Sequence, residues 1–204
     1  SPNSVYLVIK RFLKIIFKND YLSKFALSSF VNTYLNLRHY IKNTEIDFNY
    51  ILYPLNQPND EQLLVRAPNF QNNITNIKML ADCIPKNIKL IVKEHPVNPG
   101  MIKSKDIKLL KNTFSNLYFV DPNIPIRPLI KKSSGIFTIN STSGIEALIC
   151  GKKIIVMGNS YYKYNNMALK PKSKENLKQA IEELLSDSKT ETSIANSQPL
   201  TLPC

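Results

Sequence analysis

The chain has 204 residues, of which 43% are hydrophobic and 9% aromatic, so wholesale disorder and fibrous repeats are excluded. It carries 27 Lys and Arg against 15 Asp and Glu, and this net charge of +12 indicates an anionic partner: a nucleic acid, a phosphorylated sugar or a membrane surface. No apolar run reaches the ~18–20 residues of a membrane-spanning helix. Three scattered cysteines are too few for a disulfide framework or a zinc site, so we expect a cytoplasmic protein.

We expect residues 1–45 to be a basic amphipathic helical extension or a linker, and the sequence leaves two interpretations of it open. Apolar residues recur at roughly helical spacing among Lys and Arg, and no small-residue cleavage site follows, so we do not expect a signal peptide here. Such a basic amphipathic helix could lie on the anionic inner face of the cytoplasmic membrane. Alternatively, the helix packs on its own domain or on a missing neighbour. The opening residues Ser1–Ser4 resemble a cut edge, so we expect a fragment of a longer protein.

From residue 46 onward, short β-rich runs alternate with helical ones. In chain order, the patterns predict a strand at Tyr50–Leu55, a helix at Asn72–Ile84, a strand at Ile88–Lys93, a helix at Asp106–Phe114, a strand at Leu117–Asp121, a helical turn at Pro128–Lys132, a strand at Gly135–Ile139, a helix at Gly144–Cys150, a strand at Lys153–Gly158 and a helix at Lys174–Leu185. Residues 187–204 are rich in Ser, Thr and Asn without periodicity, and we expect them to be a disordered tail.

Continuous apolar strands separated by helices are typical of a parallel sheet covered on both faces. We therefore predict a doubly wound, Rossmann-like α/β domain over residues 46–186. Ligands of such sheets bind beyond the carboxyl ends of the strands, so the loops that follow the strands are the informative ones.

The first such loop contains Lys93, Glu94, His95 and Pro96. Pro96 favours an extended His95, which would hold the imidazole at the carboxyl edge of the sheet. There it could donate to a phosphate oxygen or act as a catalytic proton donor or acceptor, with the charge of Lys93 nearby. The alternative is a histidine that only satisfies a loop carbonyl.

The second loop runs from Asn140 to Ala147, with hydroxyls at Ser141, Thr142 and Ser143. A hydroxyl-rich turn that opens a helix offers backbone N–H groups and the positive end of a helix dipole to an anion. Gly144 would let a phosphate approach the backbone, and Glu146 would cap the helix or accept from sugar hydroxyls. The alternative is an ordinary helix cap without a ligand.

Several other functions find little support in the sequence. Neither a Gly-Lys phosphate loop nor a G-x-G-x-x-G fingerprint is present, and no paired carboxylates stand out. Ser141 and His95 lack the G-x-S-x-G context of a hydrolase nucleophile. Aromatic residues are not interleaved with Lys and Arg as in nucleic-acid-binding modules, so we expect no nucleic acid partner. No Asp-x-Asp metal site is seen, and we expect neither metal nor cofactor.

Together these motifs resemble the bacterial capsule polysaccharide biosynthesis family, which includes Kdo transferases. The resemblance covers about residues 48–170. It is carried, in order, by Tyr53–Pro58, Lys93–Pro96, Asn140–Leu148, Gly151–Gly158 and Tyr161–Tyr162.

The resemblance implies the C-terminal, donor-binding half of a GT-B glycosyltransferase that uses a cytidine nucleotide donor such as CMP-Kdo. It implies that His95 contacts the donor phosphate, that Ser141, Thr142 and Ser143 surround that phosphate, and that Glu146 holds the ribose. Lys93 and Asn140 would assist, the loop around Pro54–Gln57 would line the inter-domain cleft, and Tyr161 and Tyr162 would close over the nucleotide or simply pack.

By the same resemblance, the missing N-terminal domain would bind a glycan or glycolipid acceptor. The alternatives are a related transferase that uses CDP-glycerol or a UDP-sugar, and a non-catalytic module that binds nucleotide or membrane.

Overall fold

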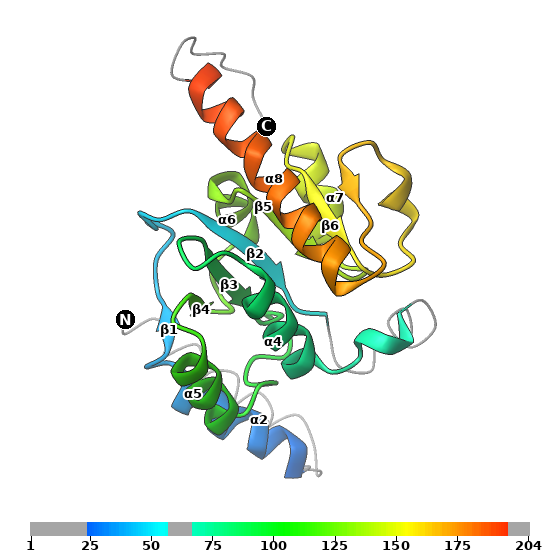
Figure 1. The fold of residues 1–204 in the computed structure, drawn as a ribbon. Helices are drawn as coiled ribbons and strands as arrows, with labels where there is room; N and C mark the ends of the chain where they lie inside the picture. The colour runs from blue at the N-terminus through cyan, green and yellow to red at the C-terminus, as the bar shows by residue number, and fades with distance from the viewer. Residues whose placement is uncertain (1–23, 57–66, 196–204) are drawn as a thin grey trace.

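The computed structural model describes residues 24–56 and 67–195. Seven strands in this part of the chain form one parallel sheet in the order β1-β4-β3-β2-β5-β6-β7 (Figure 1). The strands are β1 (Tyr40–Ile41), β2 (Tyr50–Pro54), β3 (Lys89–Lys93), β4 (Leu117–Val120), β5 (Gly135–Thr138), β6 (Ile154–Val156) and β7 (Ala168–Leu169). The helices are α2 (Lys24–Asn36), α4 (Asn73–Cys83), α5 (Ser104–Thr113), α6 (Ile126–Lys132), α7 (Ser143–Ile149) and α8 (Lys174–Ala195), with short 3-10 turns η1 (Pro68–Phe70) and η2 (Tyr161–Tyr164).

The strand order reverses beside β2. The chain passes from β2 to β3 and β4 on one side, then crosses back to β5 on the other side of β2 and continues to β6 and β7. Consequently β2 pairs with two neighbours, Tyr53 with Val92 of β3 and Leu52 with Ile136 of β5. The predicted doubly wound sheet is confirmed, and its topological switch point lies between β2 and β5.

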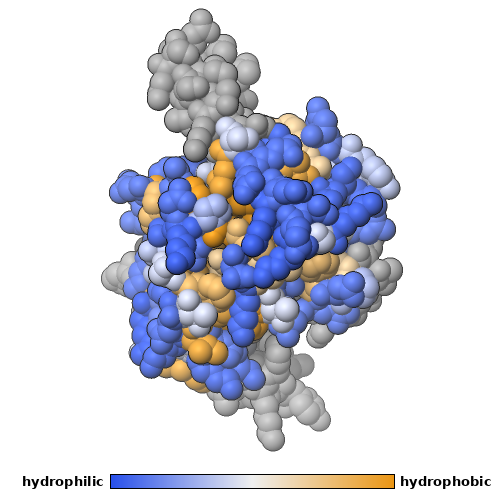
Figure 2. All heavy atoms as spheres, in the orientation of Figure 1, coloured by the Kyte–Doolittle hydropathy of each residue, from blue (hydrophilic) through white to orange (hydrophobic). Residues whose placement is uncertain are grey.

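Both faces of the sheet are buried because successive strand residues point to opposite sides. Ile51 and Tyr53 of β2 pack on the face that α4, α5 and α8 cover. Tyr50 and Leu52 pack on the other face, with α6 and α7. Figure 2, in the same orientation as Figure 1, shows mainly hydrophilic residues on the face in view, with apolar residues between them. The near-continuous apolar runs that predicted the central strands follow from this double coverage.

The N-terminal part of the described chain belongs to the same fold. Tyr40 and Ile41 of β1 pair with Phe119 and Val120 of β4, and α2 packs beside α5. The predicted domain boundary at residue 46 is therefore wrong, because an edge strand lies before it. Within residues 24–45 the segment packs on its own domain; the apolar run at residues 7–16 lies outside the described residues. None of the described helices is long and apolar enough to span a bilayer.

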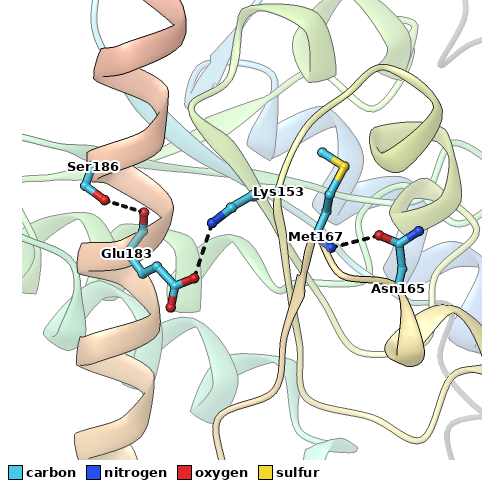
Figure 3. A network of polar contacts seen from close by, with 5 residues as sticks. All are labelled: Lys153, Asn165, Met167, Glu183 and Ser186. Atoms are coloured by element: carbon cyan, nitrogen blue, oxygen red, sulfur yellow. Dashed lines mark hydrogen bonds and ion pairs between the residues drawn. The ribbon is translucent and has the colours of Figure 1, made fainter.

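Helix α8, the last helix of the described chain, packs on one face of the sheet. Glu183 of α8 accepts from Lys153 at 3.2 Å, just before β6, and the Ser186 hydroxyl donates back to the Glu183 carbonyl (Figure 3). Nearby, the Asn165 side chain accepts from the amide of Met167 and shapes the turn into β7 (Figure 3). The helix runs to Ala195, past its predicted end at Leu185, so part of the expected tail is helical; residues 196–204 lie outside the described residues.

Candidate functional site

Four loops meet at the carboxyl ends of the central strands and enclose a cavity of about 310 Å³. They follow β2, β3, β4 and β5, so the cavity sits at the switch point of the sheet. Its lining residues are Pro54 and Leu55 after β2, Lys93–Pro96 after β3, Pro122–Ile126 after β4, and Ser141–Ser143 with Glu146 after β5. The tertiary fold thus brings the two motif loops of the sequence to one cavity.

The imidazole of His95 is half-buried at this cavity. Its Nδ1 accepts a hydrogen bond from the Val97 amide at 3.2 Å, so the neutral ring carries its proton on Nε2. Burial lowers the pKa of His95, and the nearby charge of Lys93 lowers it further. At neutral pH the ring is therefore an uncharged group with one N–H donor, which suits contact with a phosphate oxygen.

Lys93 is buried at the end of β3, where its Nζ donates to the carbonyl of Pro122 at 2.7 Å. Burial lowers the pKa of Lys93 to about 8, although the carboxylates of Asp121 and Glu94 partly offset that effect. The side chain joins the loops after β3 and β4, and its charge lies beside the cavity. Lys93 therefore makes a structural contact with Pro122, and it also lies where the predicted contact with an anion could form.

The hydroxyl loop holds itself in shape. The Ser141 side chain accepts from the Ser143 amide at 3.2 Å and donates to the Ser143 hydroxyl at 3.1 Å. The amides of Gly144 and Ile145 donate to the carbonyls of Ser141 and Thr142. We predicted free backbone amides at the start of this helix. That prediction is wrong for Ser143, Gly144 and Ile145, because each of their amides already donates to an acceptor within the loop. What the loop presents to the cavity are hydroxyls, with Thr142 the exposed one.

Two predicted site residues pack elsewhere. A β-carbon at Gly144 would lie 2.7 Å from the Tyr162 ring, so this glycine makes room for the tyrosine. Asn140 lies against Gly158, where a β-carbon would come within 2.3 Å of its Oδ1. Neither Asn140 nor Gly144 lines the cavity.

Tyr162 packs beneath the hydroxyl loop. It is buried and donates to the carbonyl of Ser141 at 2.7 Å. Tyr161 beside it is 70% exposed. Of the two alternatives raised for this pair, packing describes Tyr162.

Sequence reasoning missed two parts of the site. The Pro122–Ile126 loop forms one wall of the cavity, yet it contains no ionisable residue that would have marked it; only its place after a predicted strand could have done so. Glu94 lies in the same motif as His95, but the sequence pattern indicates no role for it. It is almost fully buried and accepts three hydrogen bonds.

Comparison with known proteins places these features in context. Residues 24–198 match the model of the family described as capsule polysaccharide biosynthesis protein. Protein FixF of Sinorhizobium fredii is 30% identical over 138 residues, which are 63% of this chain and 32% of that protein. The capsule polysaccharide export protein KpsS of Escherichia coli is 32% identical over 128 residues, 58% of this chain and 32% of KpsS.

Among solved structures, KpsC of Thermosulfurimonas dismutans, a beta Kdo 2,7 transferase, matches with a TM-score of 0.50 and 19% identity. The match covers 82% of this chain and 55% of that one, and it shows a shared fold. The chain spans about a third of the length of the curated relatives it matches.

Proposed function

Because the chain belongs to the capsule polysaccharide biosynthesis family, we propose that it is the donor-binding part of a glycosyltransferase. The donor is a cytidine nucleotide sugar, CMP-Kdo in the first instance. One observation carries the proposal: His95 and the hydroxyls of Ser141–Ser143, far apart in the sequence, line the same cavity at the switch point of the sheet.

The chemistry of these groups suits a leaving phosphate. As the sugar departs from its nucleotide, negative charge grows on the phosphate oxygens. The Nε2–H of His95 and the Thr142 hydroxyl donate to those oxygens. Because Ser143 accepts from Ser141, its own hydroxyl proton is available to the same phosphate. Fixed donors of this kind stabilise developing charge without reorganising, and the positive charge of Lys93 adds to the effect.

The remaining walls have roles in the same scheme. Glu146 lies in the first turn of α7 at the cavity, where its carboxylate accepts from ribose hydroxyls. The apolar side chains of the β2 and β4 loops offer a surface to the flat nucleobase. A separate domain would hold the glycan or glycolipid acceptor and its catalytic base, and anionic membrane would be a peripheral contact.

Phosphate neutralisation by His95 and the hydroxyls makes a metal unnecessary in this scheme. Among residues 24–56 and 67–195, no three His, Cys, Asp or Glu side chains cluster in a way that could hold a metal ion. Metal independence stays a prediction, and loss of activity in chelator-treated full-length enzyme would contradict it.

Calorimetric titration with CMP, CDP and UDP tests the proposal. We expect CMP to bind, and His95→Ala to abolish binding while the protein stays folded. His39→Ala is the matched control, since His39 is the other histidine of the chain and does not line the cavity. Preference for CDP or UDP would instead favour the transferase that uses CDP-glycerol or a UDP-sugar. Absence of nucleotide binding by folded protein would contradict the proposal and favour a non-catalytic module.

A further inference from the structure

The carboxylate of Glu94 closes the loop that carries His95. It accepts from the amide of Gly100 at 2.9 Å and from the amide of Ile102 at 2.8 Å. The hydroxyl of Tyr40, on the edge strand β1, donates to the same carboxylate at 2.7 Å. A carboxylate is an acceptor only and can take all three donors, which hold both ends of residues 94–102 together.

Helix α2 supports the same loop from outside. Ser29 donates to the carbonyl of Pro99 at 2.6 Å, and Asn36 donates to the carbonyl of Ile102 at 2.9 Å. Gly100 has φ +75°, and a β-carbon there would lie 2.3 Å from the Ser29 carbonyl. The loop is therefore confined between the carboxylate on one side and α2 on the other.

This confinement reaches the imidazole through one further contact. The Val97 amide, inside the closed loop, donates to Nδ1 of His95, and that bond sets which nitrogen carries the proton. The neighbouring Asn98 amide donates to the His95 carbonyl and forms the turn. If the loop opened, Val97 would move and the ring would lose its fixed orientation.

We propose that Glu94 is the positioning residue for His95 and that it acts with α2 and β1, so that residues 24–41 are an integral part of the nucleotide site. The geometric part stands on the contacts themselves. Its bearing on donor binding rests on the proposed function.

The test uses the full chain and three variants. Glu94→Gln keeps the size of the side chain but places an amide NH₂ among N–H and O–H donors, so at least one bond is lost. Tyr40→Phe removes one donor and leaves the charge in place. Tyr50→Phe is the matched control, because Tyr50 is also buried and donates to a main-chain carbonyl, that of Leu129, away from the loop.

Nuclear magnetic resonance supplies the readout that does not depend on nucleotide. In Glu94→Gln we expect hydrogen exchange at Gly100 and Ile102 to accelerate about tenfold or more. We expect the pKa of His95 to rise toward its ordinary value as the ring becomes exposed. Removing a nearby anion would by itself lower that pKa, so a rise reports release of the loop. Tyr40→Phe should move both quantities less, in the same direction, and Tyr50→Phe neither.

The nucleotide arm separates this inference from the proposed function. Where wild-type protein binds CMP, Glu94→Gln should weaken binding about tenfold. If wild type binds no CMP while the loop readouts change, the proposed function fails and the positioning role stands. Unchanged amide exchange and an unchanged or lower His95 pKa in folded Glu94→Gln would overturn the positioning role. If that variant does not fold, the same readouts in Tyr40→Phe decide.

Discussion

The Nζ of Lys93 donates to the carbonyl oxygen of Pro122 at 2.7 Å, and this bond joins two of the four loops that build the cavity. The lysine is 4% exposed, so its charged form has lost most of its contact with water. Burial consequently lowers its pKa to about 8.

This shift makes the stability of the fold depend on pH. Between pH 8 and about 10.4 the unfolded chain keeps the Lys93 proton that the folded chain releases. The free energy of unfolding therefore gains up to ~3 kcal/mol from Lys93 as pH rises through this window. We expect Lys93→Met to lack that gain, as measured by urea unfolding at pH 7 and pH 9.5. Lys89→Met, at the other end of β3, should follow wild type; an equal gain in Lys93→Met would contradict the prediction.

Buried tyrosines set the alkaline limit of stability. Burial raises the pKa of Tyr40, Tyr50 and Tyr53 above its ordinary value of 10. Above pH 10 the unfolded chain releases phenolic protons that the folded chain keeps, so stability falls as pH rises, by up to about 1.4 kcal/mol per pH unit for each tyrosine. Tyr50→Phe should make the fall between pH 10 and 11.5 shallower in denaturant titrations, and a slope equal to wild type would argue against this cause.

The contact between Gly144 and Tyr162 predicts a steric cost. An alanine β-carbon at Gly144 would meet the ring at 2.7 Å, so Gly144→Ala should destabilise the fold by ~1–3 kcal/mol. A double-mutant cycle with Tyr162→Ala checks the cause. Gly144→Ala should cost much less in the Tyr162→Ala background, since the ring is gone. If Gly144→Ala lowers the free energy of unfolding equally with and without the Tyr162 ring, the loss comes from the main-chain conformation of residue 144 instead.

Removing two hydroxyls of the Ser141–Ser143 loop, one at a time, should distinguish an effect on ligand binding from an effect on stability. The Thr142 side chain is exposed and makes no capping hydrogen bond, so Thr142→Ala should weaken CMP binding and leave the melting temperature unchanged. The Ser141 hydroxyl bonds within the loop, so Ser141→Ala should lower stability by ~1 kcal/mol as well as affinity. Thermal unfolding and calorimetry on both variants test this. Unchanged affinity in Thr142→Ala would remove that hydroxyl from the proposed phosphate site.

Local sequence predicted the central elements because their patterns are independent of the rest of the chain. β2 and β3 are buried on both faces and therefore read as continuous apolar runs. The edge strands β1 and β7 have two residues each, too few to show any period, and they were missed. Helix α6 begins at Ile126 rather than at Pro128, because proline is tolerated in the first turn of a helix.

By itself, the sequence determined the parallel α/β sheet and the two loops of the candidate site. Buried strands, and motif residues such as His95 and Ser141, can be recognised within short stretches of sequence. Only the tertiary structure decided which other groups surround those loops and what their side chains contact. The strand order places the loop after β4, which has no ionisable residue between Pro122 and Ile126, beside His95. The fold also directs Lys93 to the carbonyl of Pro122 and Glu94 to the amides of Gly100 and Ile102. These contacts join residues from different strands and helices, and the path of the chain through the sheet, which no local pattern encodes, fixes their distances.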